Sequence, residues 1–206
     1  MRVVVLASGT GTLLQAILDA RTANGYDIVG VAADVDCPAV DRAQAAGVPT
    51  AVVAFNPDDR AGWSSQLADV VAAWNPDVVV SAGFMRILSP TFIDRFDTII
   101  NTHPALLPSF PGAHAVRDAL TYGVKVSGST IHIMDAGVDS GPIIAQQPVP
   151  VESGDDEATL HERIKVVERE LIVGVLADLA RRHTSAATTS PTTSNEVNEN
   201  KEHFHE

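Results

Sequence analysis

The stretch RVVVLASGTGTLLQAILDART, residues 2–22, indicates the fold class of this chain. It begins with an apolar run, Arg2–Ala7, which has the length of a buried strand. A loop with two glycines follows at residues 8–12, and Leu13–Thr22 then has the apolar spacing of an amphipathic helix. Because a strand that leads through a short loop into a helix is the first half of a βαβ unit, we expect a parallel sheet.

The same alternation continues along the first two thirds of the chain. Further strands are predicted at 28–33, 50–53, 78–82, 99–101, 126–134 and 142–149, and further helices at 40–46 and 60–74. Right-handed crossovers between parallel strands place helices on both faces of such a sheet. The pattern therefore predicts an α/β chain: a single domain with a doubly wound, mostly parallel, Rossmann-like sheet and helices on both faces.

The last regular element is predicted to be a helix that begins near Thr159. Thr159 and Glu162 have the spacing of a capping box, and apolar residues then recur at three- and four-residue steps as far as Val175. From Thr184 onward the chain consists mostly of Thr, Ser, Asn and Glu, which bury too little surface to offset the entropy of ordering. We therefore expect one domain at 1–183 and a polar, disordered tail at 184–206.

The composition limits the partners of the chain. Its 206 residues carry a formal net charge of -12, which repels nucleic acid but tolerates a small anionic ligand held by a few donors. The one cysteine, Cys37, excludes an internal disulfide and a cysteine-rich metal cluster, so we expect a reducing compartment. The first apolar run is too short for a signal peptide or a membrane span. These features predict a cytoplasmic protein without nucleic-acid or membrane partners.

The glycine loop after the first strand predicts a phosphate site. Glycines let backbone amides approach an anion, and the N-terminus of the following helix adds about half a positive charge. A dinucleotide-binding loop needs a third glycine where Leu14 stands, and the sequence also lacks the Gly-Lys-Ser/Thr of a P-loop. The pattern favours a bound phosphate over NAD or ATP, although a tight turn without any ligand uses the same glycines.

A polar pair follows the strand predicted at 99–101. Asn101 and His103 are two residues apart, so their side chains point the same way in extended backbone, and Pro104 keeps His103 out of the helical region. An amide donor beside an imidazole suits a carbonyl that becomes an oxyanion. A polar strand end followed by a proline-stiffened loop explains the same residues equally well.

A carboxylate in the second half of the chain could complete this site. Asp139 lies in a loop between Gly137 and Gly141, which free the backbone to bend. Close to His103, it would favour the imidazolium and could order a water that relays protons. Because aspartate is also a common turn former, composition does not decide between the two interpretations.

Five blocks of the sequence carry a resemblance to a known family. They are VLASGTGT at 5–12, AGFMRILS at 82–89, NTHPALLP at 101–108, PGAH at 111–114 and VDSGPI at 138–143. In their order and spacing they closely resemble the folate-dependent phosphoribosylglycinamide formyltransferases, from Val3 to about Ala180. The resemblance implies a Rossmann-like formyltransferase fold and transfer of a formyl group from the co-substrate 10-formyltetrahydrofolate to the amine of glycinamide ribonucleotide. It implies neither a metal nor a covalent intermediate.

The resemblance also assigns roles to individual residues. The family's catalytic residues match Asn101, His103 and Asp139. Its ribonucleotide contacts match Gly11, Thr12, Leu13 and Glu168, and its folate contacts match Arg60, Met85, Arg86, Ile87 and Leu88 together with Asn101. From its place after the proline and glycine at 111–112, we expect His114 to contact a substrate or to support the residues that do.

Two departures from the family pattern affect these expectations. Leu13 stands where the family often has asparagine, so backbone amides must hold the phosphate without a side chain there. The chain also lacks the further strand segment that many relatives carry after the final helix. The second departure concerns the edge of the domain and leaves the catalytic residues in place.

The sequence leaves several alternatives open. Methionyl-tRNA formyltransferases and formyltetrahydrofolate hydrolases share the chemistry, but the former normally carry a C-terminal tRNA domain and the latter an N-terminal regulatory domain. A catalytically silent nucleotide-binding domain would have no reason to keep Asn101, His103 and Asp139 together. His132 is interpreted as a core or edge residue and His161 as a surface residue. A monomer and a homodimer are both compatible with the sequence.

Overall fold

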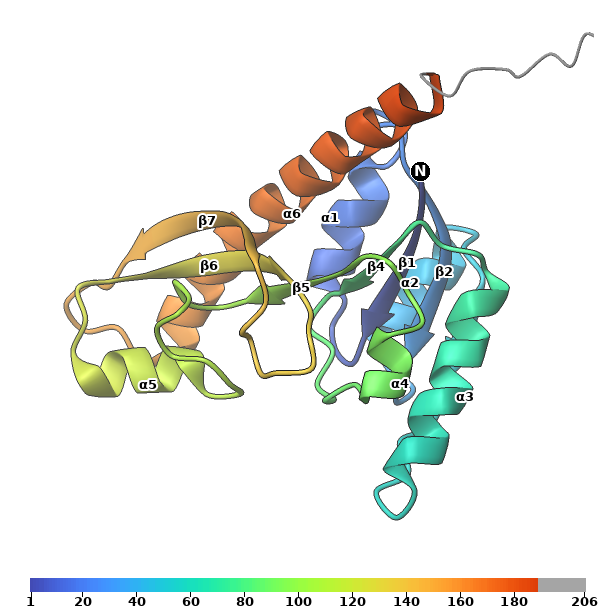
Figure 1. Cartoon of the computed structure of the whole chain (residues 1–206). Coiled ribbons are helices and arrows are strands. Elements are labelled where there is room, and N and C mark those ends of the chain that lie inside the picture. The colour runs from blue at the N-terminus through green and yellow to red at the C-terminus, as the bar shows by residue number, and fades with distance from the viewer. Residues whose placement is uncertain (189–206) are drawn as a thin grey trace, which may run out of the picture.

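Strands and helices alternate from the first residues onward (Figure 1). The computed structural model describes residues 1–188. The strands are β1 (Arg2–Ala7), β2 (Asp27–Ala33), β3 (Thr50–Val52), β4 (Val78–Ser81), β5 (Ile99–His103), β6 (Val126–Ile133) and β7 (Ile143–Pro150). The helices are α1 (Thr12–Ala20), α2 (Pro38–Ala45), α3 (Arg60–Ala73), α4 (Pro90–Ile93), α5 (Ala115–Tyr122) and α6 (Glu157–Thr188).

The strands form one sheet in the order β3-β2-β1-β4-β5-β6-β7. β1 pairs in parallel with β2 on one side and with β4 on the other. The chain therefore adds β2 and β3 on one side of β1 and then returns to add β4 and the later strands on the other side. β3 and β5 extend the parallel part, whereas β6 and β7 are antiparallel to their neighbours. The predicted α/β class with a doubly wound, mostly parallel sheet is confirmed.

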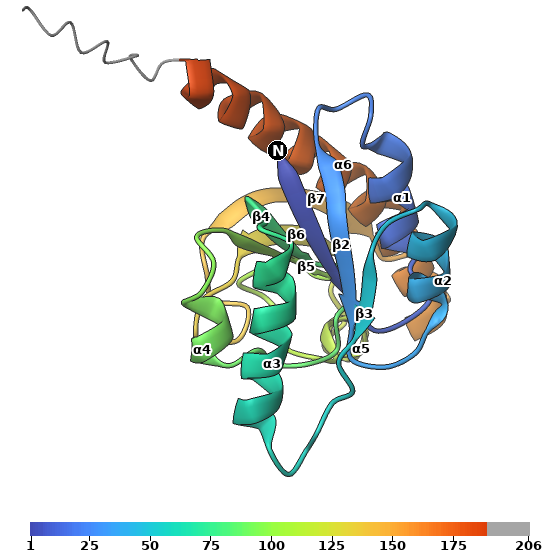
Figure 2. The same cartoon turned by 90° about the vertical axis from the view of Figure 1, so that its right-hand side faces the viewer.

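Helices cover both faces of this sheet (Figure 2). Along β1, Val3 and Val5 belong to a core shared with α1, α2 and α6, while Val4 and Leu6 belong to a core shared with α3 and α4. Figure 2 accordingly shows α1 and α2 on one side of β1–β3 and α3 and α4 on the other. Because β1 is buried on both faces, its apolar run is unbroken instead of alternating with polar residues.

Two short helices are not among the elements predicted from the sequence. α4 has four residues and begins after Ser89, whose hydroxyl accepts a hydrogen bond from the amide of Phe92. α5 has eight residues and ends at Tyr122, followed by Gly123 as the C-cap in a left-handed conformation with φ 83°. Both lie in the region between β4 and β6, where the sequence was interpreted as strand ends and loops.

The long helix α6 differs from the prediction at both ends. Its N-cap is Asp156 and not Thr159: the Asp156 carboxylate accepts from the Thr159 amide at 2.8 Å, and the Thr159 hydroxyl accepts from the Asp156 amide at 2.9 Å. The helix continues through Thr188, beyond the boundary expected at 183, and the rest of the expected tail, 189–206, lies outside the described residues. Within residues 1–188, no helix combines the length and apolar character needed to cross a membrane.

The topology brings three loops to one edge of the sheet. Since β1, β4 and β5 are parallel, their carboxyl ends lie side by side, and the strand order reverses between the first two. In open sheets of this kind, ligands bind outside the carboxyl ends of the strands at such a reversal. The loops after these strands are therefore the expected place for a functional site.

Candidate active site

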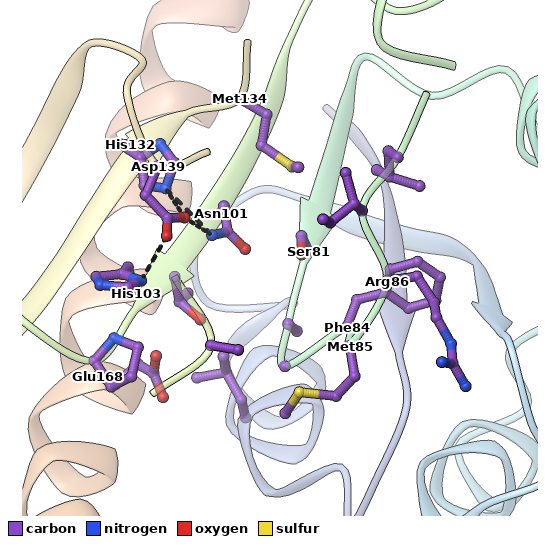
Figure 3. Close-up of a pocket in the computed structure, with 18 of the residues that line it drawn as sticks. Ser81, Phe84, Met85, Arg86, Asn101, His103, His132, Met134, Asp139 and Glu168 are labelled. Atoms are coloured by element: carbon purple, nitrogen blue, oxygen red, sulfur yellow. Dashed lines mark hydrogen bonds and ion pairs between the residues drawn. The ribbon is translucent and has the colours of Figure 1, made fainter. Parts of the chain in front are cut away.

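A cavity of about 470 Å³ opens at the carboxyl ends of the central strands. Its wall consists of the loops after β1, β4 and β5, the segment between β6 and β7, and one face of α6. Figure 3 shows one side of the cavity formed by Asn101, His103, His132, Asp139 and Glu168, and the opposite side by Phe84, Met85 and Arg86.

Three side chains predicted to act together meet in this cavity. Nδ1 of His103 lies 3.2 Å from Oδ2 of Asp139, and Nδ2 of Asn101 lies 3.5 Å from Oδ1 of the same carboxylate. β5 continues through His103, so Asn101 and His103 are alternate residues of one extended strand and project from the same face. The structure therefore brings together an amide, an imidazole and a carboxylate from two distant parts of the chain.

The backbone of the loop after β6 places Asp139. Asp139 adopts a left-handed conformation with φ 52°, which aspartate tolerates better than most residues because its short side chain can hydrogen-bond locally. Its Oδ2 atom accepts a hydrogen bond of 2.7 Å from the amide of Gly112. The carboxylate thus joins the loop after β6 to the loop after β5 and to His103.

The surroundings shift the pKa values of both ionisable partners. Burial lowers the pKa of His103 from its ordinary value of 6.5, and the Asp139 carboxylate and the Phe110 carbonyl oppose this effect without overcoming it. Interaction with His132 lowers the pKa of Asp139, and the Gly112 amide and the charge of His103 act in the same direction against burial. Asp139 does favour the imidazolium of His103, as predicted, but burial has the larger effect.

The second ring nitrogen of His103 is also engaged. Nε2 lies 2.8 Å from the carbonyl oxygen of Phe110, a residue with φ 54°. A carbonyl can only accept, so Nε2 carries a proton and donates it. With Asp139 at Nδ1 and a carbonyl at Nε2, the ring is surrounded by acceptors and is placed to hold and release a proton.

His132 belongs to this site, although no local sequence pattern indicates it. The ring is buried, with Nε2 3.2 Å from Nδ2 of Asn101 and 3.5 Å from Oδ1 of Asp139 (Figure 3). The interpretation of His132 as a core or edge residue was right about burial but missed these contacts. His132 could have been found from its position opposite Asn101 on the neighbouring strand. This position follows from the pairing of β5 with β6, which cannot be read from the sequence.

The glycine loop after β1 ends at a helix N-terminus that faces the cavity. Gly11 has φ 70° and precedes α1, and no side chain caps the first amides of this helix. Free amides at a helix N-terminus are suited to bind an anion. Arg42 of α2 holds the loop by donating to the carbonyl of Thr10 at 2.8 Å. Thr12 and Leu13 line the cavity, as expected for a phosphate loop.

One face of α6 contributes charged groups to the same cavity. Glu168 is buried, and burial raises its pKa, while a hydrogen bond with Thr102 and the charges of Lys165 and Arg169 lower it. Lys165 and His161 precede Glu168 by one and two turns and also line the cavity. His161 is partly exposed, and its place in the cavity wall was not predicted. Lys165 was not singled out from the sequence.

The segment after β4 forms the opposite, mostly apolar wall. Met85, Ile87 and Leu88 all line the cavity: Met85 and Ile87 have exposed fractions of 74% and 65%, and Leu88 is mostly buried. The amide of Met85 donates to the hydroxyl of Ser8 at 2.9 Å, which ties this segment to the glycine loop. Exposed methionine and isoleucine side chains beside a cavity suit a flat, apolar ligand group.

Arg86 in the same segment is held by a buried carboxylate. Its Nε atom lies 2.6 Å from Oδ2 of Asp34, whose side chain is buried, and its guanidinium lies 4.2 Å from the centre of the Phe55 ring. The ion pair and the cation–π contact fix the side chain at the edge of the cavity.

Comparison with known proteins identifies the family of this chain. A family model described as formyl transferase matches residues 1–176. The chain belongs to the formyl transferase family. The predicted resemblance is therefore confirmed, and the cavity described above is that of a formyl transferase.

Relatives of this formyl transferase include two bacterial enzymes with the same name. The chain is 56% identical over 183 residues to a phosphoribosylglycinamide formyltransferase of Mycobacterium tuberculosis, covering 87% of this chain and 85% of the relative. It is 38% identical over 198 residues to the phosphoribosylglycinamide formyltransferase of Escherichia coli, covering 91% and 92%. The crystal structure of glycinamide ribonucleotide transformylase 1 from Symbiobacterium toebii matches with a TM-score of 0.82 and 39% identity over 88% of each chain.

Two predicted residues, Arg60 from the resemblance and His114 from its place in the sequence, do not reach the cavity of this formyl transferase. Arg60 is exposed at the first position of α3, and His114 is exposed immediately before α5; neither lines the cavity. The neighbouring Gly112 and Ala113 do line it. Among residues 1–188, no group of three or more His, Cys, Asp or Glu side chains is arranged to hold a metal ion.

Proposed function

We propose that this formyl transferase moves the formyl group of 10-formyltetrahydrofolate to the amine of glycinamide ribonucleotide, a step of purine synthesis. The observation that carries the proposal is the meeting of Asn101, His103 and Asp139 in one cavity wall. The cavity also joins a helix N-terminus suited to phosphate to an apolar wall suited to a pteridine. Relatives at 56% and 38% identity carry the name phosphoribosylglycinamide formyltransferase, which favours this acceptor over methionyl-tRNA or water.

In the proposed reaction, the amine attacks the formyl carbon directly. The carbonyl oxygen becomes an oxyanion, to which the Asn101 amide can donate a hydrogen bond. The His103 ring can donate a second one from Nε2 if that N–H leaves the carbonyl of Phe110. One proton then leaves the attacking nitrogen, and one reaches the folate nitrogen as its bond to the formyl carbon breaks. Asp139 holds His103 by its Nδ1 atom and can order a water that carries the proton between the two nitrogens.

We propose that the ribonucleotide lies along α1 and α6. The amides of Gly11, Thr12 and Leu13 would hold its phosphate, and no side chain caps them in α1. Leu13 offers an apolar side chain and therefore contributes through its backbone. Glu168, buried and close to Thr102, would accept a hydrogen bond from the ribonucleotide.

We propose that the folate occupies the wall after β4. The apolar side chains of Met85, Ile87 and Leu88 would contact the pteridine, and Arg86 would lie at the edge of the cavity, where Asp34 holds it. Arg60 lies outside the cavity wall, so a role for it requires that the folate extends toward the start of α3.

We further propose that the catalytic unit is the domain predicted at 1–183, acting in the cytoplasm on these two small molecules. Shortening the chain after Thr188 preserves α6 as the structure describes it and is expected to leave formyl transfer intact.

The test is formyl transfer by the purified protein with a stable 10-formyl folate analogue, with each substrate omitted in turn. Release of deformylated folate that requires glycinamide ribonucleotide supports the proposal. Release without any acceptor indicates a hydrolase, and release that requires methionyl-tRNA indicates the other transferase. Binding of either substrate without any release indicates a silent binding domain. Each of these last three outcomes contradicts the proposal.

A further inference from the structure

A buried imidazole with no part in the proposed reaction lies directly behind Asn101. His132 is 2% exposed and ranks among the largest side chains that are fully buried in residues 1–188. Its Nε2 atom lies 3.2 Å from Nδ2 of Asn101, which is closer than its 3.5 Å separation from Oδ1 of Asp139. A hydrogen bond in such a dry place is stronger than one exposed to water.

The backbone builds this contact. Asn101 of β5 is paired directly with His132 of β6 in the antiparallel part of the sheet. Side chains of residues paired in this way stand on the same face, with their Cβ atoms about 5 Å apart. The register of β6 with β7 shifts between Ile131 and His132. Such irregularities re-aim a side chain and are frequent beside active sites.

The hydrogen bonds of His132 define its protonation pattern. Nδ1 lies 2.9 Å from the carbonyl oxygen of Ile133, which can only accept, so Nδ1 carries the proton. In the neutral ring, Nε2 then presents a lone pair, whereas in the imidazolium Nε2 donates to Asp139 and lowers the pKa of that carboxyl. The atom of Asn101 that can approach a lone pair is the amide nitrogen, which is the atom found there.

The opposite orientation of the Asn101 amide is unfavourable. Turning the amide over would place its oxygen against the lone pair of His132 and the carboxylate of Asp139. The orientation matters for the reaction, because an oxyanion needs an N–H group and is repelled by a carbonyl oxygen. The second N–H of Asn101 makes only the long contact of 3.5 Å with Asp139, so it is the one left to donate to the oxyanion while the first stays on His132.

We infer that His132 is a positioning residue that holds the Asn101 amide in the orientation in which one of its N–H groups remains for the reacting formyl oxygen. The inference rests on the proposed function, since it assigns a role to Asn101 in formyl transfer. In this role His132, which also lines the cavity, acts through Asn101 and not by contact with a substrate. Removing its acceptor therefore affects turnover and leaves the binding of both substrates nearly unchanged.

Two substitutions separate the acceptor from the bulk of the ring. His132→Leu keeps an apolar side chain and removes the acceptor, whereas His132→Gln can present an amide oxygen close to the place of Nε2. We expect His132→Leu to lower kcat about 10-fold, a part of the ~100- to 1000-fold that a lost oxyanion donor costs. We expect His132→Gln to recover most of this loss, with both KM values near those of the wild type. An unchanged kcat in His132→Leu contradicts the inference.

A double-mutant cycle with Asn101→Ala distinguishes positioning from a general structural role. If His132 acts through Asn101, His132→Leu should change kcat by less than about twofold once Asn101 is alanine. A loss of the same size in both backgrounds would show that His132 acts through the fold or through Asp139, and would overturn the inference. Thermal unfolding of each variant identifies any that does not fold.

A second measurement does not depend on catalysis. The ¹⁵N chemical shifts of the His132 ring in the wild-type protein report which nitrogen carries the proton. We expect a neutral ring protonated at Nδ1, and a ring protonated at Nε2 overturns the inference. If the wild type shows this pattern but transfers no formyl group to the ribonucleotide, the proposed function has failed, while the hydrogen-bonding arrangement behind Asn101 stands.

Discussion

Nδ1 of His103 lies 3.2 Å from Oδ2 of Asp139, and this contact joins the end of β5 to the loop after β6. The Asp139 carboxylate favours the protonated imidazole, while burial of His103 disfavours it more strongly. The pKa of His103 therefore results from two opposing effects, of which one can be removed by a single substitution.

Asp139→Asn is expected to lower the pKa of His103 further below its ordinary value, because the opposing charge is removed and burial remains. A protonated His103 then persists only to a lower pH. The high-pH limb of the kcat/KM profile should move to lower pH, and turnover at pH 7 should fall about 100-fold or more. Asp135→Asn in the same loop is the matched control, because Asp135 binds Gly137 and Ser140 and makes no contact with His103. An unchanged profile in Asp139→Asn would make Asp139 a turn residue.

Asn101→Ala is expected to reduce turnover by ~100- to 1000-fold, the usual cost of one oxyanion donor. Because the proposed donation strengthens as the oxyanion forms, KM for either substrate should change little. Single-turnover kinetics with both substrates saturating checks the loss. Asn56→Ala is the control, because Asn56 is exposed and does not line the cavity. More than about a tenth of wild-type turnover in folded Asn101→Ala would remove Asn101 from the mechanism.

The fold was predictable where the apolar residues of an element follow a clear strand or helix spacing. The buried strands β1 and β4 read as short apolar runs, and α3 is long enough to show helical spacing. α4 has only four residues, too few for any period, and α5 is defined as much by Gly123 at its end as by its apolar residues. The N-cap of α6 was misplaced because Asp156 and Thr159 satisfy the same spacing as Thr159 and Glu162.

The site was predictable only in part from local patterns. Asn101 and His103 follow from the two-residue period of a strand, whereas Asp139 came from the family resemblance, since a turn-forming aspartate looks the same. His132 was missed because its contact with Asn101 depends on the pairing of β5 with β6, which no local pattern specifies. The contact between Arg60 and folate remains a prediction, because Arg60 lies on α3 outside the cavity wall.

Glu168→Gln is expected to raise KM for the ribonucleotide and to stabilise the protein at neutral pH. Burial raises the pKa of Glu168 above 4.5, so ionisation is penalised more in the folded than in the unfolded state. This penalty is absent at pH values below the pKa of Glu168 in the unfolded state. It grows as pH rises from that value to the higher pKa of the folded state, and it is constant above the folded-state pKa. The gain in Tm from Glu168→Gln should therefore be present at pH 8 and vanish near pH 4.

Glu170→Gln on the same helix is the control for this comparison, because Glu170 is exposed. It should change neither the ribonucleotide KM nor the pH dependence of Tm. A gain in Tm for Glu168→Gln that is equal at pH 4 and pH 8 would trace the effect to packing instead of charge. A ribonucleotide KM equal to that of the wild type would remove Glu168 from the substrate site.

Arg86→Met is expected to weaken both the fold and the binding of folate. Asp34 is buried and its Oδ1 atom has no hydrogen-bond partner, so the ion pair with Arg86 is its main compensation. Breaking a buried ion pair costs ~3–5 kcal/mol, and we expect about 2 kcal/mol here because water partly screens Arg86. Its side chain is 37% exposed. The free energy of unfolding from urea titration and KM for the folate analogue measure the two effects.

The double variant Asp34→Asn with Arg86→Met separates these two effects. Replacing Asp34 removes the uncompensated charge, so the double variant should unfold at nearly the urea concentration of the wild type, while KM for folate stays raised. Arg60→Met is the matched control: Arg60 is exposed, so stability should not change, and a raised folate KM would support its proposed contact. If Arg86→Met is as stable as the wild type, the pair with Asp34 does not stabilise the fold. If its folate KM is also unchanged, Arg86 does not belong to the folate site.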